Sequence, residues 1–199
     1  MLSRNIENMS LYKRMIEIID VNLIYCLAPI VLTLIVAELF FKRRFETKKV
    51  LNLICWLIIL YSTITWVYSL IGMIFYSEEF AFSKRATGSY AWAYWIMFLS
   101  AFILPFTLFI KKISSNFYYV LFVAIFMKIG FYFERFVVIV TSFHRDYQTE
   151  NENAEFTDSL LFGILMMFIQ GILIAIILLS IFEIIKKKRT KDKSLITDL

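Results

Sequence analysis

The chain has 199 residues, of which 60% are hydrophobic and 18% aromatic, and it carries a net charge of +5 with only 5 Gly and 2 Pro. A soluble domain of this length cannot bury so much apolar surface, so the composition excludes an ordinary globular protein and indicates a membrane protein. The basic excess has no accompanying basic-aromatic RNA motif. We therefore interpret it as a sign of membrane orientation and of contact with membrane lipid, and expect no nucleic acid partner.

Five segments are long and apolar enough to cross a hydrocarbon core about 30 Å thick, which takes roughly 20 residues per helix. They span residues 18–41, 50–76, 91–110, 117–143 and 160–185. The runs lack the short alternating pattern of a membrane β-barrel. The sequence thus predicts an all-α polytopic membrane protein with a single transmembrane domain over residues 1–199. The first run is too late and too long for a cleaved signal peptide, so we expect it to act as the insertion signal.

The short loops on the two sides of this topology differ in their Lys and Arg content. The side that carries the N-terminus has 6 such residues, and the side that carries the C-terminus has 13. Because cytoplasmic loops are enriched in Lys and Arg, we expect the N-terminus outside and the C-terminus in the cytoplasm. The acidic loop at 144–159 then faces the outside.

The first and third predicted helices carry polar and helix-breaking residues. Glu17 and Asp20 open the first helix, where carboxylates suit a helix N-terminus, and we interpret them as interfacial. Pro29 and Pro105 lie inside the first and third helices, where each removes a backbone donor, so kinks are expected. The aromatic stretch at 90–95 fits an interfacial aromatic belt.

The fourth predicted helix carries ionisable residues inside the membrane. Lys128 lies 11 residues after Phe117, which is on the order of 16 Å into the span and near its middle. Glu134 and Arg135 lie about 12 to 13 Å below the outer end, and they cannot pair well with each other because adjacent residues point about 100° apart. Such charges cost about 3 kcal/mol on insertion scales and are therefore candidates for function. The alternative for Glu134 and Arg135 is a cross-helix ion pair that only fixes packing.

The chain lacks the residues of a self-contained cofactor site. Cys26 and Cys55 lie apart without CxxC or ferredoxin-like spacing, and we interpret them as two buried thiols. His144 is the only histidine, which excludes a bis-histidine haem within one subunit. Gly-rich phosphate loops, G-x-S-x-G and HExxH motifs are absent. We expect this chain alone to bind no metal and no cofactor, and any haem or iron–sulfur centre to be held by partner subunits.

Two longer strings stand about 30 residues apart, KRATGSYAWAYWIMF at 84–98 and KIGFYFERFVVIVTSFHRDY at 128–147. In order, spacing and detail they resemble the NrfD-like family of polysulfide reductase membrane subunits, and most closely the quinol-oxidising membrane subunit of bacterial alternative complex III. The resemblance is strong over about residues 60–147 and weaker toward both ends. That family has two four-helix bundles followed by a last helix. The resemblance thus implies that this chain corresponds to the C-terminal half, one four-helix bundle plus a C-terminal helix.

The resemblance also implies a setting and a set of site residues. It implies a respiratory complex in the bacterial inner membrane, with partner subunits that hold the cofactors and supply the missing first bundle. Because the family's quinol site is associated with that first bundle, quinol or quinone is expected only with those partners. Positions that match the second bundle's polar residues, together with the deeply placed lysine, are the candidates for a proton relay: Glu134, Arg135, Lys128, His144, Arg145 and Asp146. Candidates for docking at the outer face are Arg145, Trp92 and Trp95.

Two outer loops depart from the family pattern. QTENENAEF replaces a Pro-rich continuation after HRDY, and Gly88-Ser89 replaces Gly-Pro. Both changes fall where contacts with partner subunits would be made.

Three functions are open from the sequence. The first is a membrane subunit, or split half, of a quinol:acceptor oxidoreductase complex in electron transfer, with Glu134 as a proton-exchanging carboxylate tuned by Arg135. On this hypothesis the chain is at most a subunit of an enzyme that carries no cofactor itself. The second is a non-catalytic membrane scaffold or assembly protein derived from the same family. The third, a small transporter, has less support because inverted repeats and Gly-broken helix pairs are absent.

Overall fold

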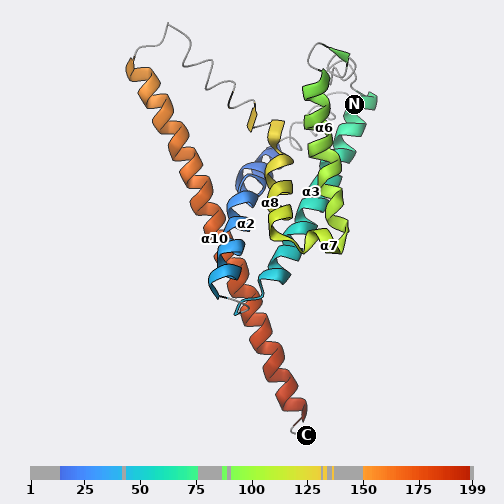
Figure 1. Ribbon diagram of the computed structural model, residues 1–199, viewed down its shortest axis with the longest axis vertical. Helices are drawn as coiled ribbons and strands as arrows, with labels where there is room; N and C mark the ends of the chain where they lie inside the picture. Colours follow the sequence, from blue (N-terminus) through green and yellow to red (C-terminus); the bar gives the residue numbers. More distant parts are fainter. Residues whose placement is uncertain are drawn as a thin grey trace, which may run out of the picture.

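The computed structural model describes residues 14–41, 44–75, 87–88, 91–130, 132–133, 136 and 150–197, and within 150–197 it describes the side chains of 162–189. All regular structure in these ranges is helical (Figure 1). The elements are the π-helix η1 (Asp20–Ile24), α2 (Leu27–Phe41), α3 (Thr47–Phe75), α6 (Ala91–Phe106), the 3-10 helix η2 (Thr107–Phe109), α7 (Lys111–Ser114), α8 (Phe117–Phe126) and α10 (Glu150–Thr197). The predicted all-α fold class is confirmed.

Four helical stretches are long and apolar enough to cross a membrane, namely Arg14–Phe41, Thr47–Ile74, Ala91–Phe109 and Phe162–Arg189. They coincide with four of the five predicted spans. Of the remaining span, predicted at 117–143, the structure describes α8 and a few residues after it, and the rest lies outside the described residues. α10 extends beyond the predicted 160–185 at both ends, because the Glu-, Lys- and Arg-rich flanks of its apolar centre favour helix.

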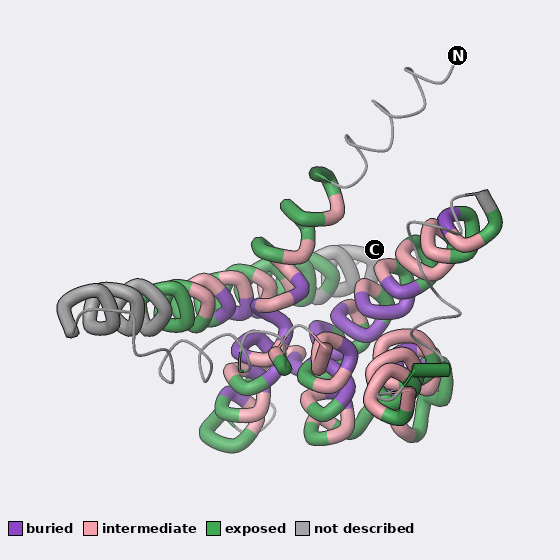
Figure 2. The backbone as a smooth tube through the Cα atoms, turned by 90° about the horizontal axis from the view of Figure 1, so that it is seen from above, coloured by how far each residue is buried: buried purple, intermediate pink, exposed green. Residues whose placement is uncertain are grey.

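Four helices form a ring. α2 contacts α3, α3 contacts α6, α6 contacts α8, and α8 contacts α2, while α10 packs along α2 and α3 (Figures 1 and 2). This matches the predicted four-helix bundle with a C-terminal helix. The core between the helices is aliphatic, and on α2 its members recur at intervals of three and four residues: Leu27, Ile30, Val31 and Leu34. Such spacing aligns them on one face.

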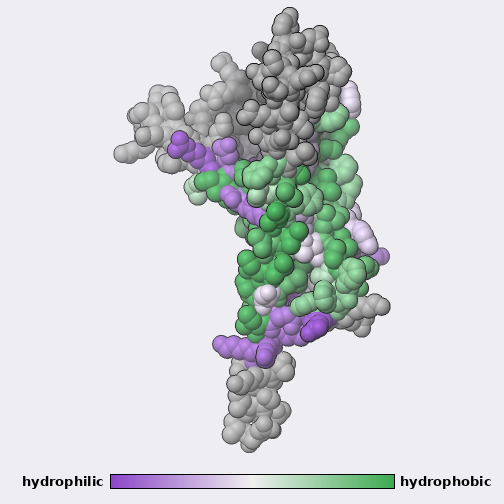
Figure 3. Space-filling model, turned by 90° about the vertical axis from the view of Figure 1, so that its left-hand side faces the viewer, coloured by the Kyte–Doolittle hydropathy of each residue, from purple (hydrophilic) through white to green (hydrophobic). Residues whose placement is uncertain are grey.

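The outer surface is apolar around its middle, as contact with membrane lipid requires. Figure 3 shows an apolar belt bounded by hydrophilic residues. Large hydrophobic side chains are exposed on every long helix, among them Leu39, Ile74, Ile103 and Ile176. One end of the bundle, here called the basic end, carries the exposed cations Arg44, Lys48, Lys49, Lys111, Lys112 and 186–189.

The first span is irregular just before Pro29. The N–H of Tyr25 donates to the carbonyl of Asp20 at 2.9 Å, which is the five-residue spacing of a π-helix, and a turn then leads into α2. Pro29 lacks an N–H, and its ring crowds the carbonyl of the residue four positions earlier. The irregularity predicted around Pro29 is therefore present. Pro105 is the penultimate residue of α6, and the chain continues as the 3-10 helix η2.

α10 crosses the irregular segment at close range. The side-chain amide of Gln170 donates to the carbonyl of Asn22 at 3.1 Å, so α10 supplies a donor to the backbone of the π-helix. At Gly171, a Cβ would lie 2.6 Å from Cγ of Pro29 and 3.0 Å from the carbonyl oxygen of Cys26. The close contact between α10 and the Pro29 ring thus requires glycine.

We predict that Gly171→Ala lowers the free energy of unfolding relative to Gly163→Ala by about 1 to 3 kcal/mol, because its methyl group overlaps the rigid Pro29 ring. Apart from its own helix, no described residue has an atom within 4 Å of a Cβ placed at Gly163, so that variant is a matched control on the same helix. Both changes gain the same helix propensity, hence their difference isolates the contact. The two variants are compared by reversible unfolding in mixed micelles. Equal stabilities would contradict the close approach.

A second prediction concerns Glu46, in the loop between α2 and α3. Its carboxylate lies 3.1 Å from Nζ of Lys49 and 3.5 Å from Nζ of Lys186. The hydrogen bond from Lys49, with help from Lys186, lowers the pKa of Glu46 below its ordinary value of 4.5. A carboxyl whose pKa is lower in the folded chain stabilises it above the unfolded value, and this contribution disappears as the pH falls through the folded value.

We therefore expect the wild type to be more stable than Glu46→Gln at neutral pH. The difference in unfolding free energy between them should shrink as the pH falls below about 4.5, and it should vanish once the pH is below the lowered pKa of the folded chain, where the carboxyl is protonated in both states. Unfolding of both proteins is followed across this range in the same detergent. A difference that stays constant down to low pH would show that Glu46 acts through packing rather than charge.

Candidate functional site

The structure describes three of the residues predicted to carry function. These are Lys128, Trp92 and Trp95. The other predicted positions lie outside the described residues: Glu134, Arg135, His144, Arg145 and Asp146. The candidate site is therefore built outward from Lys128.

Lys128 lies where α8 is interrupted. α8 ends at Phe126, Met127 and Lys128 form a turn, and helical structure resumes at Ile129 and Gly130. The N–H of Lys128 donates to the carbonyl of Ile125 at 3.3 Å, a three-residue spacing that tightens the chain at this point. Two residues after Lys128 the chain packs closely against α6, because a Cβ at Gly130 would lie 3.2 Å from the sulfur of Met97.

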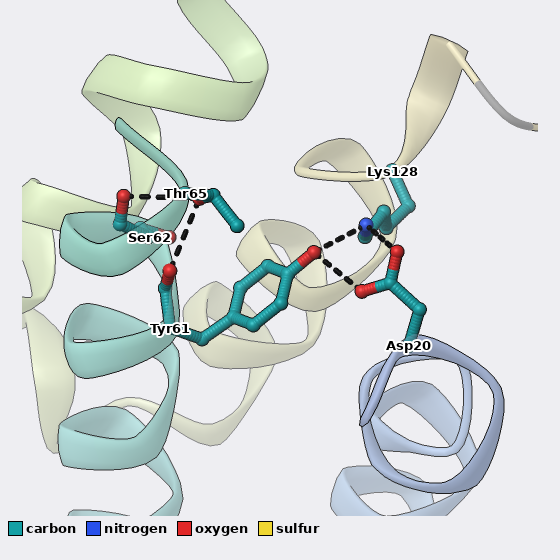
Figure 4. Close-up of polar contacts among 5 residues, drawn as sticks. All are labelled: Asp20, Tyr61, Ser62, Thr65 and Lys128. Carbon is teal, nitrogen blue, oxygen red and sulfur yellow. Dashed lines mark hydrogen bonds and ion pairs between the residues drawn. The ribbon is translucent and has the colours of Figure 1, made fainter. Parts of the chain in front are cut away.

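The ammonium of Lys128 binds two side chains from other helices (Figure 4). It lies 2.8 Å from Oδ2 of Asp20 and donates to the hydroxyl of Tyr61 at 2.7 Å. The Tyr61 hydroxyl in turn donates to Oδ1 of Asp20. The three groups close a triangle in which each one is bonded to the other two, and we call it the Lys128 cluster. It joins the first span, α3 and the end of α8.

Aromatic rings adjoin the cation. Nζ of Lys128 is 5.6 Å from the centre of the Tyr25 ring, a distance at which the ring face attracts a cation. The 5.0 Å distance to the Tyr61 ring centre has a different meaning. It follows from the hydrogen bond to the hydroxyl, so Lys128 meets the edge of that ring rather than its face.

The Lys128 cluster lies deep in the span and is largely shielded. Tyr61 is 14 residues from the start of α3 at Thr47, or about 21 Å along a helix, and Lys128 is about 16 Å from the start of α8. The side chains of Lys128 and Asp20 are 17% and 16% exposed. At this depth each charge needs the other, because a single charge in the membrane is costly.

The interpretation of Asp20 as an interfacial carboxylate at a helix N-terminus is wrong. The described helix already includes Arg14, and Asp20 is the first residue of η1, with its side chain turned to Lys128 (Figure 4). π-helical segments are rare and frequently mark functional sites. Sequence reasoning also missed Tyr61, because a tyrosine within an apolar helix is usually a packing residue. The only available signal was that Tyr61 and Lys128 stand at similar depths in their helices.

Polar groups continue along α3 from the Lys128 cluster. The hydroxyl of Thr65 donates to the carbonyls of Tyr61 and Ser62, both at 3.0 Å. Ser62 is buried, and its hydroxyl has no hydrogen-bond partner among the described residues. The interior of the bundle beside Tyr61 is thus less apolar than its surroundings.

The described part of the chain contains no group of three or more His, Cys, Asp or Glu able to hold a metal ion. Cys26 and Cys55 are buried free thiols, as predicted. The Sγ of Cys55 lies 3.7 Å from the carbonyl oxygen of Ser114, a weak contact that serves packing. The Lys128 cluster itself offers exchangeable protons on its ammonium and hydroxyl groups.

Trp92 and Trp95 lie in the first turns of α6, at the opposite end from the basic end. Their side chains are 68% and 41% exposed. The Trp95 ring packs edge-on against Phe98 with centres 5.7 Å apart. This position agrees with the predicted aromatic belt, and docking at these residues stays a prediction.

Comparison with known proteins gives no further assignment: no family model, no curated protein and no solved structure matches the chain. Any function has to be inferred from the Lys128 cluster and from the sequence resemblance. The two sources meet at Lys128, which begins the second motif string, whereas Asp20 lies outside the resembling range of 60–147.

We predict that Lys128→Met lowers the free energy of unfolding by about 3 to 5 kcal/mol, because it leaves the Asp20 carboxylate in the membrane without its counter-ion. The double variant Asp20→Asn/Lys128→Met has no stranded charge and should be more stable than Lys128→Met alone. Tyr61→Phe, which removes one hydroxyl, should cost about 1 to 3 kcal/mol. The four proteins are compared by unfolding in mixed micelles. If the double variant is no more stable than Lys128→Met alone, the Asp20 carboxylate does not depend on Lys128 as its counter-ion.

Proposed function

We propose that this chain is a membrane subunit, or split half, of a quinol:acceptor oxidoreductase complex, and that the Lys128 cluster is part of its proton relay. The observation that carries the proposal is the closed triangle of Lys128, Asp20 and Tyr61 at mid-span. An ionisable residue inside a membrane indicates function by default, and here its partners are known.

The cluster has the chemical properties that proton exchange requires. Its carboxylate, ammonium and hydroxyl are bonded in sequence, so a proton moves between neighbours without a large displacement. Both Asp20 and Lys128 stand at interruptions of their helices, where the backbone is less constrained than in a continuous helix. Protonation of Asp20 removes one half of the ion pair and frees Lys128 to bind elsewhere.

The sequence resemblance supplies the setting. Lys128 is the first residue of the string KIGFYFERFVVIVTSFHRDY. On this proposal Glu134, Arg135, His144, Arg145 and Asp146 continue the relay toward the outside, and partner subunits hold the quinol and the metal centres. The membrane is the bacterial inner membrane, with the basic end in the cytoplasm because Lys and Arg favour that side.

The apolar surface supports the requirement for partners. Only 11% of the apolar window of the α6 span and 17% of that of the α10 span are buried within the chain. Faces of this kind suit lipid or the helices of another subunit. In this proposal, the chain that supplies the first bundle packs against these exposed faces of α6 and α10.

Copurification tests the assignment to a complex. Mild detergent extraction from native membranes should yield haem- or iron–sulfur-containing subunits and a second membrane chain together with this protein. If the isolated protein carries none of these, the proposal fails at its first step.

The relay is tested with Asp20→Asn/Lys128→Met, which removes both charges and leaves neither one unpaired in the membrane. We expect the rate of proton transfer coupled to quinol oxidation to fall by at least about tenfold, the lower end of the usual range for a lost proton-transfer group. Lys111→Met, an exposed lysine at the basic end, is the matched control and should keep the wild-type rate. An unchanged rate in the double variant, together with loss of the whole complex when the protein is deleted, would instead favour the membrane scaffold.

A specific observation also favours a second candidate, a small transporter. Two interrupted helices meet at a charged pair in the middle of the span, which is the arrangement of ion sites in many transporters. Reconstitution of the protein alone into liposomes decides between the two. Ion or proton flux that is abolished by Asp20→Asn/Lys128→Met would support a transporter, whereas impermeable liposomes would support the subunit.

A further inference from the structure

An open groove lies at the basic end, between α3 and α10. Its volume is about 650 Å³, within the usual range of roughly 300 to 1,000 Å³ for ligand pockets. α3 contributes Lys48, Lys49 and Trp56 to its lining, and α10 contributes Phe182, Lys186 and Arg189. The groove is remote from the Lys128 cluster, none of whose residues line it.

The lining changes from cationic to apolar in the same direction on both helices. Lys48 precedes Trp56 by eight residues, and Arg189 follows Phe182 by seven, so the backbone positions of cation and ring are about 10 to 12 Å apart along the axis of each helix. The helices run antiparallel, and both therefore place their cations at the basic end and their rings toward the centre of the span. The groove has a charged rim above an apolar floor.

The rim coincides with the membrane boundary. Lys48 stands in the first turn of α3, and Arg189 belongs to the run of four cations at 186–189 that follows the apolar part of α10. Cations that flank an apolar stretch in this way stand at the level where lipid headgroups lie. Arginine and lysine at such a level hold phosphate groups by charge-assisted hydrogen bonds. The apolar floor below the rim suits an apolar chain better than a water-soluble ligand.

Not all of the cations are equally available. Lys49 and Lys186 bind Glu46 at 3.1 and 3.5 Å, and Lys186 also lies 3.7 Å from Glu183. Among the described residues, no carboxylate forms an ion pair with Lys48 or Arg189. Within the part of the chain that the structure describes, the groove thus presents two cations without an acidic partner at its rim.

We propose that this groove is a binding site for an anionic phospholipid, with the phosphate between Lys48 and Arg189 and the upper acyl chain along Trp56 and Phe182. Basic pockets between transmembrane helices bind anionic headgroups in this way. An anionic phospholipid has a negative headgroup that matches the rim and an apolar chain that matches the floor. The site is independent of the function proposed for the Lys128 cluster.

Binding is measured by titrating the full-length protein in detergent with phosphatidylglycerol and counting retained lipids by native mass spectrometry. Lys48→Glu/Arg189→Glu should weaken binding by at least about tenfold, since each basic residue near a membrane surface contributes about 1 kcal/mol to the attraction. Lys187→Glu/Lys188→Glu makes the same change of charge on exposed residues outside the groove and should weaken it by less than about threefold. Equal losses in the two variants would overturn the proposal, because they would reveal only a general charge effect.

Trp56 reports on the apolar part of the site. The chain has 4 Trp, and replacing Trp66, Trp92 and Trp95 by Phe leaves Trp56 as the sole fluorophore. Phosphatidylglycerol with brominated acyl chains should quench its emission at lower concentration than brominated phosphatidylcholine does. Equal quenching by the two lipids overturns the proposal, and so does displacement of the lipid by inorganic phosphate, which would indicate a site for the free anion. If the glutamate variant fails to fold, Lys48→Gln/Arg189→Gln takes its place in both measurements.

Discussion

The ion pair between Lys128 and Asp20 is the interaction on which the rest of the structure depends. Helices in a membrane gain little from apolar contact with one another, because lipid is as apolar as their side chains. Aliphatic residues on α2 and α8 therefore hold the two helices together without fixing their relative height. A charged pair that has no alternative partner in lipid fixes it, and the Tyr61 hydroxyl extends the same constraint to α3.

Irregular backbone accompanies this pair on both helices. Asp20 stands in a π-helix and Lys128 in a turn, so both charged residues are on helices that depart from regular geometry where they meet. α10 completes the arrangement, since Gln170 supplies a donor to the Asn22 carbonyl and Gly171 lets the helix approach Pro29. The C-terminal helix is thus part of the support of the Lys128 cluster, although it contributes no charge to it.

Four of the five predicted spans, the helical class and the distance of Lys128 from the start of its helix could be predicted, because hydropathy and helix rise are local properties. The irregularity around Pro29 could also be predicted, because proline disturbs a helix through its own ring and its missing N–H. The partners of Lys128 could not be predicted from the sequence. Packing between distant segments decides which helices meet and in what register. Asp20 was misinterpreted for this reason: near the start of an apolar run a carboxylate is read as interfacial until the helix is seen to begin earlier. Gly171 gave no signal either, because only the approach of Pro29 makes it necessary.

The separation of the pair along the chain has a consequence for biogenesis. Asp20 and Lys128 are 108 residues apart, so at a synthesis rate of about 5 to 20 residues per second the carboxylate is made about 5 to 20 seconds before its partner. During that interval the first helix is held in the bilayer with an uncompensated acid. Its position six residues from Arg14 lets it wait near the polar headgroups and be drawn inward when the later helix arrives. The fold is therefore completed only after both segments have been inserted separately into the membrane, when they close on each other.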